Sequence, residues 1–253
     1  ATYYADQDGD THGDATNTTK ACTRPEGYAL NKDDCNDNDK SAYPGAIEVP
    51  INGVDEDCDE VDGQILEFSS GDGHTLALDD KGHVWAWGSN SDGQLGDGSE
   101  SDQSTPVHIP GLNGVVSIGA GASHSVALLS DGSLMAWGSN EFGQLGDGTF
   151  ISQPTPIAIP TLTQVVELMV GPYVTFTQVA NGDVYAWGSN SNGQLGDGTT
   201  EDQNIPTPVT GLNDVYEIKL SADHRFVVAI GPDILAGTFV RPSVAFPLAV
   251  HLD

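Results

Sequence analysis

The chain has 253 residues, of which 37 are acidic and only 8 are lysine or arginine, so the formal net charge at pH 7 is −29. Such a negative field repels nucleic acid and anionic lipid and attracts cations, which argues against a DNA, RNA or membrane-surface role. No apolar stretch approaches 18 residues, so the sequence predicts no membrane insertion. The chain opens within a motif and without an initiator methionine, and we expect it to be a fragment or mature piece of a longer protein.

Residues 1–62 contain three clusters of closely spaced aspartates and form an N-terminal module in our interpretation. The first cluster places carboxylates at alternate positions of a glycine-bearing loop, which lets them converge on one calcium ion. Its candidate ligands are Asp6, Asp8, Asp10, His12 and Asp14. We expect His12 to offer its backbone carbonyl rather than its ring. Asn17 stands where an EF-hand loop has glutamate, so a carboxylate from elsewhere is expected to complete this site.

The second and third clusters supply further oxygen ligands. The candidate ligands of the second cluster are Asp34, Asn36, Asp37, Asn38 and Asp39. Glu48 lies at position 12 counted from Asp37, where a bidentate carboxylate would close a calcium site. The candidate ligands of the third cluster are Asp55, Asp57, Asp59 and Asp62.

Calcium is the expected cofactor of this module, with two or more ions bound. Three empty acidic clusters would repel one another, because no comparable group of basic residues accompanies them. Hard oxygen ligands with almost no soft ones favour calcium over copper or zinc. The alternative is that each cluster is an acidic turn in contact with solvent.

All three cysteines lie in this segment, which indicates an oxidising compartment with one disulfide and one remaining thiol. The segment resembles the metal-binding motif family labelled after MopE, which is found in secreted bacterial proteins. The matching stretches are Tyr3–Asp6, Asp8–Asp10, Gly27–Tyr28, Asp34–Asp37, Tyr43–Glu48 and Asn52–Asp59. The resemblance implies an extracellular or cell-surface protein. The copper association of the family label is not supported by this composition.

The resemblance also bears on the disulfide. Members of the MopE-type family usually have a cysteine just after the Glu-Val pair, where this chain has Pro50. The departure implies that Cys58 lacks its usual partner and that Cys22 and Cys35 form the surviving disulfide.

Residues 63–253 are dominated by an internal repeat of 50 residues. The sequence Trp-Gly-Ser-Asn begins at Trp87, Trp137 and Trp187, and each copy is followed by Gly-Gln-Leu-Gly-Asp-Gly. A fixed period of this size indicates a radial or solenoidal β architecture, in which each unit buries its apolar face against the next. The full units are 65–114, 115–164 and 165–214, and 215–253 is a degenerate fourth unit.

Within each unit, alternating apolar and polar residues predict paired strands, such as 74–78 and 84–87 in the first. Asp131-Gly132 and Asn181-Gly182 are strong hairpin-turn signals at matching positions of the later units. The region is therefore expected to be all-β. Its motif, Gly-x-x-His-x-x-Ala-Leu and then Trp-Gly-x-Asn-x-x-Gly-Gln-Leu-Gly, is similar to the RCC1 repeat, the unit of a β-propeller.

Propellers of the RCC1 family generally have seven blades, whereas this chain has three full repeats and one degenerate repeat. The resemblance leaves three options: a small closed propeller, an open arc, or a ring that other subunits complete, as in a homo-oligomer. Apolar residues alternate strictly over 244–252, which predicts a strand that closes the ring onto the first unit or seals a subunit interface.

The sequence offers no catalytic constellation, so we expect that the protein is not an enzyme. His74, His124 and His224 recur in register, but on the strand face that also carries apolar residues, and Val174 takes this position in the third unit. This pattern predicts buried structural histidines. Aspartates in the Gly-Asp-Gly turns are expected to support the tight backbone there rather than to act as bases.

The candidate binding residues lie where the repeats differ. Phe142 aligns with Asp92 and Asn192. Phe150 aligns with Glu100 and Thr200, and Ile151 aligns with Ser101 and Glu201. If exposed, these three apolar loop residues would form a recognition patch. The alternative is that they pack against a neighbouring loop, the acidic module or another subunit.

Together these features predict a non-enzymatic recognition or adhesion module, stabilised by calcium and binding a protein or glycan through propeller loops. We expect it to be secreted or displayed on a bacterial cell surface. The main alternative is a purely structural spacer or oligomerisation element of a larger secreted protein. A secreted hydrolase is the remaining, less favoured hypothesis.

Overall fold

The computed structural model describes residues 1–36, 38–50, 52–59, 63–211, 217–220 and 227–230. These residues form strands, turns and bends, and no helix, so the expected all-β class is confirmed. In this part of the chain no helix of the length and apolar character needed to cross a bilayer is found. The chain divides into two compact units: Ala1–Ile65 with Asp79–Lys81, and Leu66–Leu78 with Gly82–Asp253.

The first unit has one small antiparallel sheet, with strand order β2-β1-β3. Its strands are β1 (Thr2–Ala5), β2 (Asp14–Lys20) and β3 (Tyr28–Ala29). Only a few small or aromatic side chains, such as Tyr3, Ala5 and Ala29, are buried there. So small a core contributes little to the stability of this unit.

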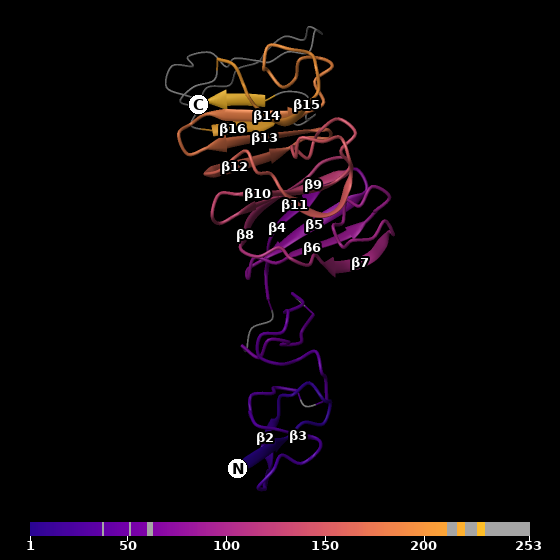
Figure 1. Ribbon diagram of the computed structural model, residues 1–253, viewed down its shortest axis with the longest axis vertical. Helices are drawn as coiled ribbons and strands as arrows, with labels where there is room; N and C mark the ends of the chain where they lie inside the picture. The colour runs from indigo at the N-terminus through magenta and orange to yellow at the C-terminus, as the bar shows by residue number, and fades with distance from the viewer. Residues whose placement is uncertain (37, 51, 60–62, 212–216, 221–226, 231–253) are drawn as a thin grey trace. The chain divides into compact units, whose positions relative to one another are not determined.

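The second unit contains three four-stranded antiparallel sheets, each built by one repeat and stacked in chain order (Figure 1). The first sheet consists of β4 (Ile65–Ser70), β5 (His74–Asp79), β6 (Val84–Gly88) and β7 (Gln103–His108). The second consists of β8 (Val115–Ala120), β9 (His124–Leu129), β10 (Leu134–Gly138) and β11 (Gln153–Ala158). The third consists of β12 (Val165–Val170), β13 (Val174–Val179), β14 (Val184–Gly188) and β15 (Gln203–Pro208).

The fourth repeat contributes two described strands, β16 (Glu217–Leu220) and β17 (Val227–Ile230), which pair antiparallel. His224 and the alternating segment 244–252 lie outside the described residues. The predictions made for them therefore stay predictions.

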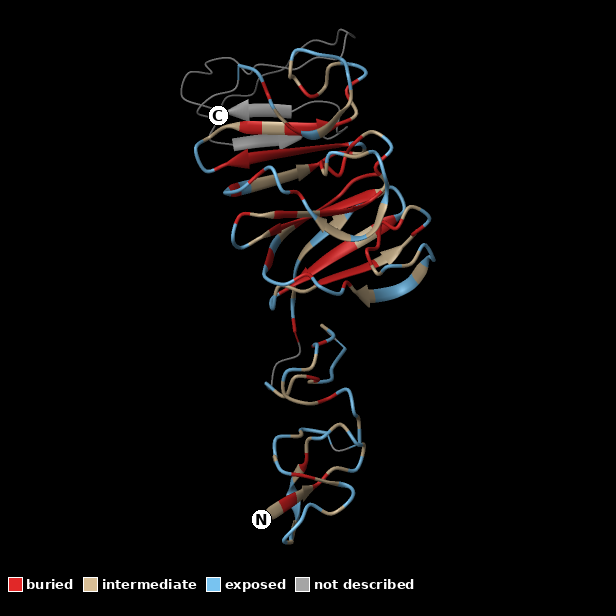
Figure 2. Cartoon of the chain, viewed as in Figure 1, coloured by how far each residue is buried: buried red, intermediate tan, exposed pale blue. Residues whose placement is uncertain are grey.

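The core lies between successive sheets rather than within one. One buried cluster joins residues of the first and second sheets, and another joins the second and third. In β9, Ala127 belongs to the first cluster, whereas Val126 and Leu128 belong to the second, as alternation along a strand requires. Figure 2 shows the resulting pattern: the middle strands are mainly buried, and the outer strand β7 is largely exposed.

A buried tryptophan links the second and the third sheet to the sheet that precedes each of them. The indole Nε1 of Trp137 donates a hydrogen bond of 2.9 Å to the backbone carbonyl of Gln94. Trp187 donates one of the same length to the backbone carbonyl of Gln144. Both side chains are fully buried. An indole of this size contributes about 5 kcal/mol of hydrophobic stabilisation for some 200 Å² removed from water.

This contact explains the Gly-Gln-Leu-Gly motif. Gly96 has φ of +75°, and a Cβ there would lie 2.7 Å from the Trp137 Nε1 atom. Gly146 has the same relation to Trp187, at 2.6 Å. Any larger residue would both strain the backbone and push the indole away from its acceptor.

The first sheet has no preceding repeat to cover it in the described part of the chain. Phe68 is 63% exposed, whereas Ile118, its counterpart in the second repeat, is 4% exposed. Trp87 is only half-buried and contacts the Phe68 ring edge-on, with ring centroids 6.4 Å apart. The described repeats therefore end on an apolar face at the first sheet.

His74 and His124 are buried, as predicted, and they bridge the sheets. Ser125 donates its hydroxyl hydrogen to the Gln94 carbonyl (2.8 Å), so the His74 Nε2 atom, 2.9 Å away, must be the donor to Ser125. His124 and Thr175 repeat the arrangement one sheet further on. The Nδ1 atoms of His74 and His124 are buried without a hydrogen-bond partner. A proton added there would be both charged and unpaired.

Burial accordingly lowers the pKa of His74 to about 4 and that of His124 to about 3. In the unfolded chain these groups take up a proton near pH 6.5, so folding stability is complete above that pH and falls as the pH drops toward 4. We expect each histidine to lower the free energy of unfolding by about 2 kcal/mol between pH 7 and pH 5.

Urea denaturation of the wild type and the His124→Val variant at pH 7 and pH 5 measures this effect. The variant has the residue that the third repeat carries at Val174, and it should lose roughly half of the pH dependence. If the two proteins lost the same stability between pH 7 and pH 5, protonation of His124 would not contribute to the loss.

Candidate functional site

The first acidic loop, which follows β1, brings three predicted ligands together. Carboxylate oxygens of Asp6, Asp8 and Asp10 lie within 4.8 Å of one another. Each also shapes the loop, because its Oδ1 atom accepts a backbone N–H further along the chain. Asp6 accepts from Gly9, Asp8 accepts from Asp10, and Asp10 accepts from His12. These bonds hold the alternate side chains on one side of a tight turn, which is the geometry a cation requires.

The remaining predicted ligands of this loop lie elsewhere. Asp14 accepts hydrogen bonds from the hydroxyl and the backbone N–H of Thr16, and these bonds lower the pKa of its carboxyl. The His12 ring lies 2.9 Å from an Asp33 oxygen and stacks on Tyr43 with centroids 5.3 Å apart. The Nδ1 atom of His12 is therefore engaged by protein groups, and the expectation that His12 offers its backbone carbonyl to a metal stays a prediction.

The second acidic cluster is not gathered into one group in the described residues. Asp34 accepts the backbone N–H of Asn36, and Asp39 accepts from the hydroxyl and N–H of Ser41, which lower its pKa. Asn38 accepts a hydrogen bond from Gln7. Asp37 of this cluster and Asp62 of the third lie outside the described residues.

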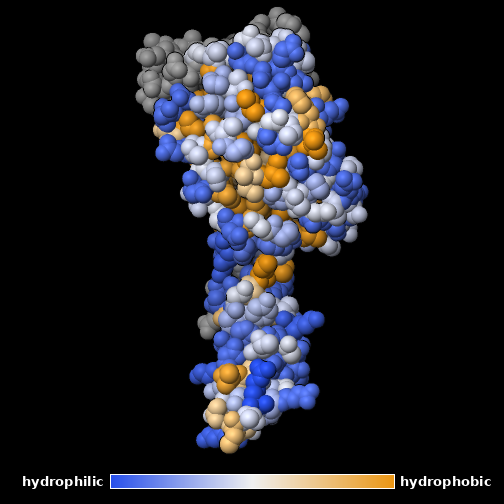
Figure 3. Space-filling model, viewed as in Figure 1, coloured by the Kyte–Doolittle hydropathy of each residue, from blue (hydrophilic) through white to orange (hydrophobic). Residues whose placement is uncertain are grey.

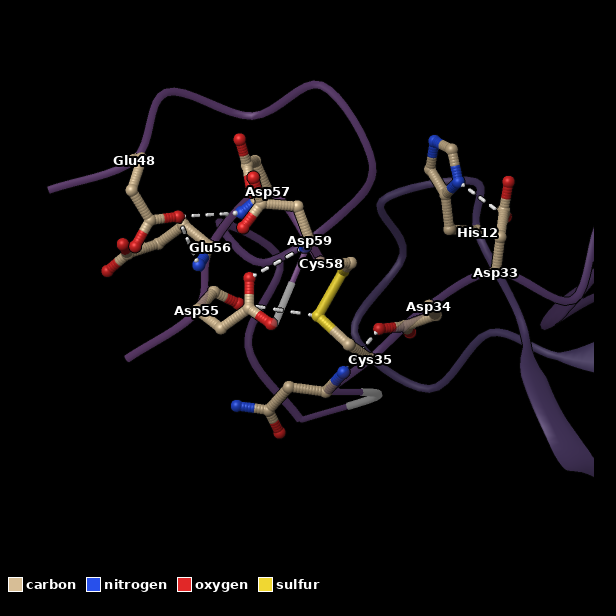
Figure 4. The surroundings of a disulfide bond; sticks show 11 residues. His12, Asp33, Asp34, Cys35, Glu48, Asp55, Glu56, Asp57, Cys58 and Asp59 are labelled. Atoms are coloured by element: carbon tan, nitrogen blue, oxygen red, sulfur yellow. Dashed lines mark hydrogen bonds and ion pairs between the residues drawn. A yellow bond between two sulfur atoms is a disulfide. The ribbon is translucent and has the colours of Figure 1, made fainter. Parts of the chain in front are cut away.

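Glu48 joins the third cluster rather than the second. Its carboxylate lies with those of Asp55 and Asp57, with oxygens within 4.8 Å of one another (Figure 4). Glu48 is 1% exposed, and its Oε2 atom accepts the backbone N–H groups of Glu56 and Asp57 at 3.0 and 3.1 Å. Its Oε1 atom is buried without a hydrogen-bond partner. Counting loop positions from Asp37 could not reveal this grouping, because it depends on how the chain folds back after Pro50.

The electrostatics of this group favour a cation. Burial, and then the nearby charges of Glu56 and Asp57, raise the pKa of Glu48, although the N–H of Asp57 opposes the shift. The Oδ1 atom of Asp57 is also buried without a partner. Buried carboxylates left uncompensated are costly. The three carboxylates could hold a divalent cation of the calcium type, which would engage the unpaired oxygens.

Lys81 neutralises part of the surrounding charge. Its ammonium group forms ion pairs with Asp59 and, at 3.3 Å, with Asp57 Oδ2. These contacts, that to Asp59 above all, raise the pKa of Lys81. Asp59, a predicted ligand of the third cluster, is therefore paired with Lys81 and is not part of the group formed by Glu48, Asp55 and Asp57.

Sequence reasoning missed Glu56 as a structural brace. Both of its carboxylate oxygens are used, because Asn52 Nδ2 donates to Oε1 at 2.6 Å and the Val49 N–H donates to Oε2 at 3.0 Å. Together with Glu48 it pins the loop over residues 48–57. The sequence carried no signal that separated this glutamate from its acidic neighbours.

The disulfide prediction was wrong. The structure joins Cys35 to Cys58, with Cα atoms 5.6 Å apart, and Cys22 is exposed and free (Figure 4). The absence of a cysteine at Pro50 does not leave Cys58 unpaired, because the braced loop over 48–57 carries it to Cys35. The bridge ties this loop to the segment that contains Asp34.

In the second unit, the candidate binding residues are partly exposed and partly packed. Phe150 and Ile151 are 54% and 67% exposed. Phe142 instead contacts Tyr173 of the next repeat edge-on, with ring centroids 5.4 Å apart. Both alternatives from the sequence therefore hold, for different residues: exposure for the pair and packing for Phe142.

Two further exposed apolar residues belong to the same region. Tyr173 replaces Gly73 and Ser123 of the other repeats, and Ile205 replaces Thr105 and Thr155. Comparing the repeats position by position would have found both residues. We call the set the apolar rim: Phe142, Phe150, Ile151, Tyr173 and Ile205.

The Trp-Gly-Ser-Asn turns keep these loops in place. Asn140 is fully buried, its Oδ1 atom accepts the Leu145 N–H, and its Nδ2 group donates to Asp147 and to the Ile151 carbonyl. Asp147 also accepts the backbone N–H of Thr149. The aspartates of the Gly-Asp-Gly turns thus support the loop backbone.

The repeated sheets, their shared linking tryptophans and their common loop define an RCC1-type propeller repeat. A family model for the RCC1-like domain matches residues 8–233, and the chain belongs to that family. The match to the MopE-type motif in residues 1–62 stays a prediction.

Solved structures agree on the fold. The chain is similar to yeast RCC1 (Prp20) in a complex with Kap60, with 23% identity, 68% of this chain and 42% of that chain covered, and a TM-score of 0.55. Prp20p of Saccharomyces cerevisiae gives 24% identity, coverages of 68% and 44%, and a TM-score of 0.54. Human WBSCR16 gives 20% identity, coverages of 90% and 54%, and a TM-score of 0.60. The chain thus spans about half the length of these proteins, or less.

Proposed function

We propose that this chain is a non-enzymatic recognition module that binds a protein or glycan through the apolar rim. The observation that carries the proposal is the exposure of Phe150 and Ile151 at positions that are polar in the other repeats. Exposed apolar side chains on a loop held by a rigid scaffold are typical of binding surfaces. A merely structural repeat would have no reason to differ there from its neighbours.

Relatives of the same fold lend support. Yeast RCC1 (Prp20) has been solved bound to Kap60, and the structure of Prp20p is described together with its binding to Gsp1p and histones. The RCC1-type fold is thus used by those proteins for protein binding. We infer the same general use here.

We further propose that the acidic unit binds calcium and that the protein works in an oxidising, extracellular setting. The unpaired buried oxygens of Glu48 and Asp57 support calcium binding, and the disulfide between Cys35 and Cys58 supports the setting. Because this unit has little core of its own, calcium binding would contribute directly to its folding free energy.

Calcium titration into the chelator-treated protein, followed by calorimetry, tests the cation proposal. We expect binding in the wild type and loss of at least one site in Glu48→Gln. This substitution removes the charge, while the amide oxygen can still accept the hydrogen bonds from the loop. The matched control is Glu26→Gln, an exposed glutamate outside the clusters, which should titrate like the wild type. Heat that is absent from the wild type, or equal in all three proteins, would contradict the proposal.

A selection from a displayed peptide and protein-fragment library tests recognition. Ligands that bind the wild type should bind the Phe150→Ser/Ile151→Ser variant at least about tenfold more weakly, because the central apolar contacts of an interface carry most of its energy. Both residues are exposed, so the melting temperature should stay within a few degrees. Val116→Ser/Val166→Ser, which alters two other exposed apolar residues, is the matched control.

Ligands that bind wild type and variant equally would overturn the role of the rim. Light scattering on the same proteins separates recognition from assembly. A change of oligomeric state in the Phe150→Ser/Ile151→Ser variant would favour the alternative of a homo-oligomer that completes the propeller.

A further inference from the structure

The apolar rim crosses the seam between the second and third sheets. Gly148 of the second repeat donates its N–H to the Asn204 carbonyl (2.8 Å), and Asn204 Nδ2 donates back to the Gly148 carbonyl (2.8 Å). Phe142 and Tyr173 close the same seam through their ring contact. The Phe150–Ile151 turn is thus fixed on both repeats, and a partner would meet a preorganised surface.

The rim lies at one edge of the sheets, namely the edge formed by the ends of the strands and not by an outer strand. The start of β9 pairs with the end of β10, and that end pairs with the start of β11, so the loop over 139–152 leaves and returns at this edge. The third sheet repeats the arrangement, which places Tyr173 and Ile205 at the same edge. The hairpin turns that contain Asp131 and Asp183 lie at the opposite edge. Figure 3 shows hydrophobic side chains gathered among hydrophilic ones on one face of this unit.

Every charged side chain in the stretch of sequence that contains the rim is acidic. No lysine or arginine occurs between residues 82 and 218. Glu141 precedes Phe142 directly, and Glu201 takes the position in the third repeat that Ile151 has in the second. Both glutamates are exposed. Cations are therefore attracted to the rim, whereas acidic peptides, phosphate groups and anionic glycans are repelled.

From this juxtaposition we propose that the rim accepts a lysine- or arginine-rich protein segment that presents a bulky apolar side chain. The apolar side chain packs on Phe150 and Ile151, and the flanking cations lie against Glu141 and Glu201. The inference rests on the proposed recognition function and names its partner class.

Three synthetic peptides of equal length serve as probes: one of alternating lysine and leucine, one with glutamate for lysine, and one with serine for leucine. Binding is followed by fluorescence anisotropy in 0.15 M salt, a concentration at which charges further apart than about 8 Å are largely screened. We expect the lysine–leucine peptide to bind most tightly. Phe150→Ser/Ile151→Ser should weaken it about tenfold or more, and Glu141→Gln/Glu201→Gln several-fold.

The matched control for charge is Asp131→Asn/Asp183→Asn, which removes the same number of charges at the opposite edge and should leave the affinity within about twofold of the wild type. An equal loss with this control, or equal binding of the lysine–serine peptide, would reduce the effect to bulk charge and overturn the inference. Preference for the glutamate–leucine peptide, or no binding of the lysine–leucine peptide, would overturn it as well. Library ligands that depend on Phe150 and Ile151 but are neutral or acidic would leave the recognition function standing and remove only this partner class.

Discussion

The hydrogen bond from a buried tryptophan to a glutamine carbonyl of the preceding repeat is the contact on which the second unit depends. Trp137 and Trp187 each place an indole in the core between two sheets and use its single N–H to fix the register. The same carbonyls accept the hydroxyls of Ser125 and Thr175, which in turn meet the histidines. Because each acceptor lies in the Gly-Gln-Leu-Gly turn, one contact positions both the sheet stack and the adjoining loop.

In the second unit, different residues hold the sheets together and form the proposed binding surface. Residues that link the sheets recur every 50 positions, whereas the apolar rim consists of residues that differ between repeats, as Phe150 does from Glu100 and Thr200. The acidic unit follows another principle. There Glu48 and Glu56 organise a loop through backbone N–H groups, and the disulfide to Cys58 closes it. In our account a bound cation compensates the carboxylate charges of this unit that Lys81 leaves uncompensated.

Sequence reasoning predicted the repeat, the all-β class and the burial of His74 and His124, because period and polarity encode them directly. It singled out Phe150 and Ile151 by comparing the repeats, but it left open whether they are exposed or packed. It also placed Asp6, Asp8 and Asp10 correctly in one loop, since alternation within a short turn is a local property. It failed where long-range folding decides. The grouping of Glu48 with Asp55 and the pairing of Cys35 with Cys58 both depend on a loop braced by Glu56, and no spacing rule reveals that brace.

Hydrogen exchange of the indole N–H groups, followed by NMR and assigned with single Trp→Phe variants, tests the central contact most directly. Trp137 and Trp187 should exchange as slowly as buried strand amides, since release of either proton requires the sheets to separate. Trp87, which is half-buried at the uncovered end of the described repeats, should exchange orders of magnitude faster. Equal exchange at the three indoles would contradict the account, because the repeats would then not be held together through these bonds.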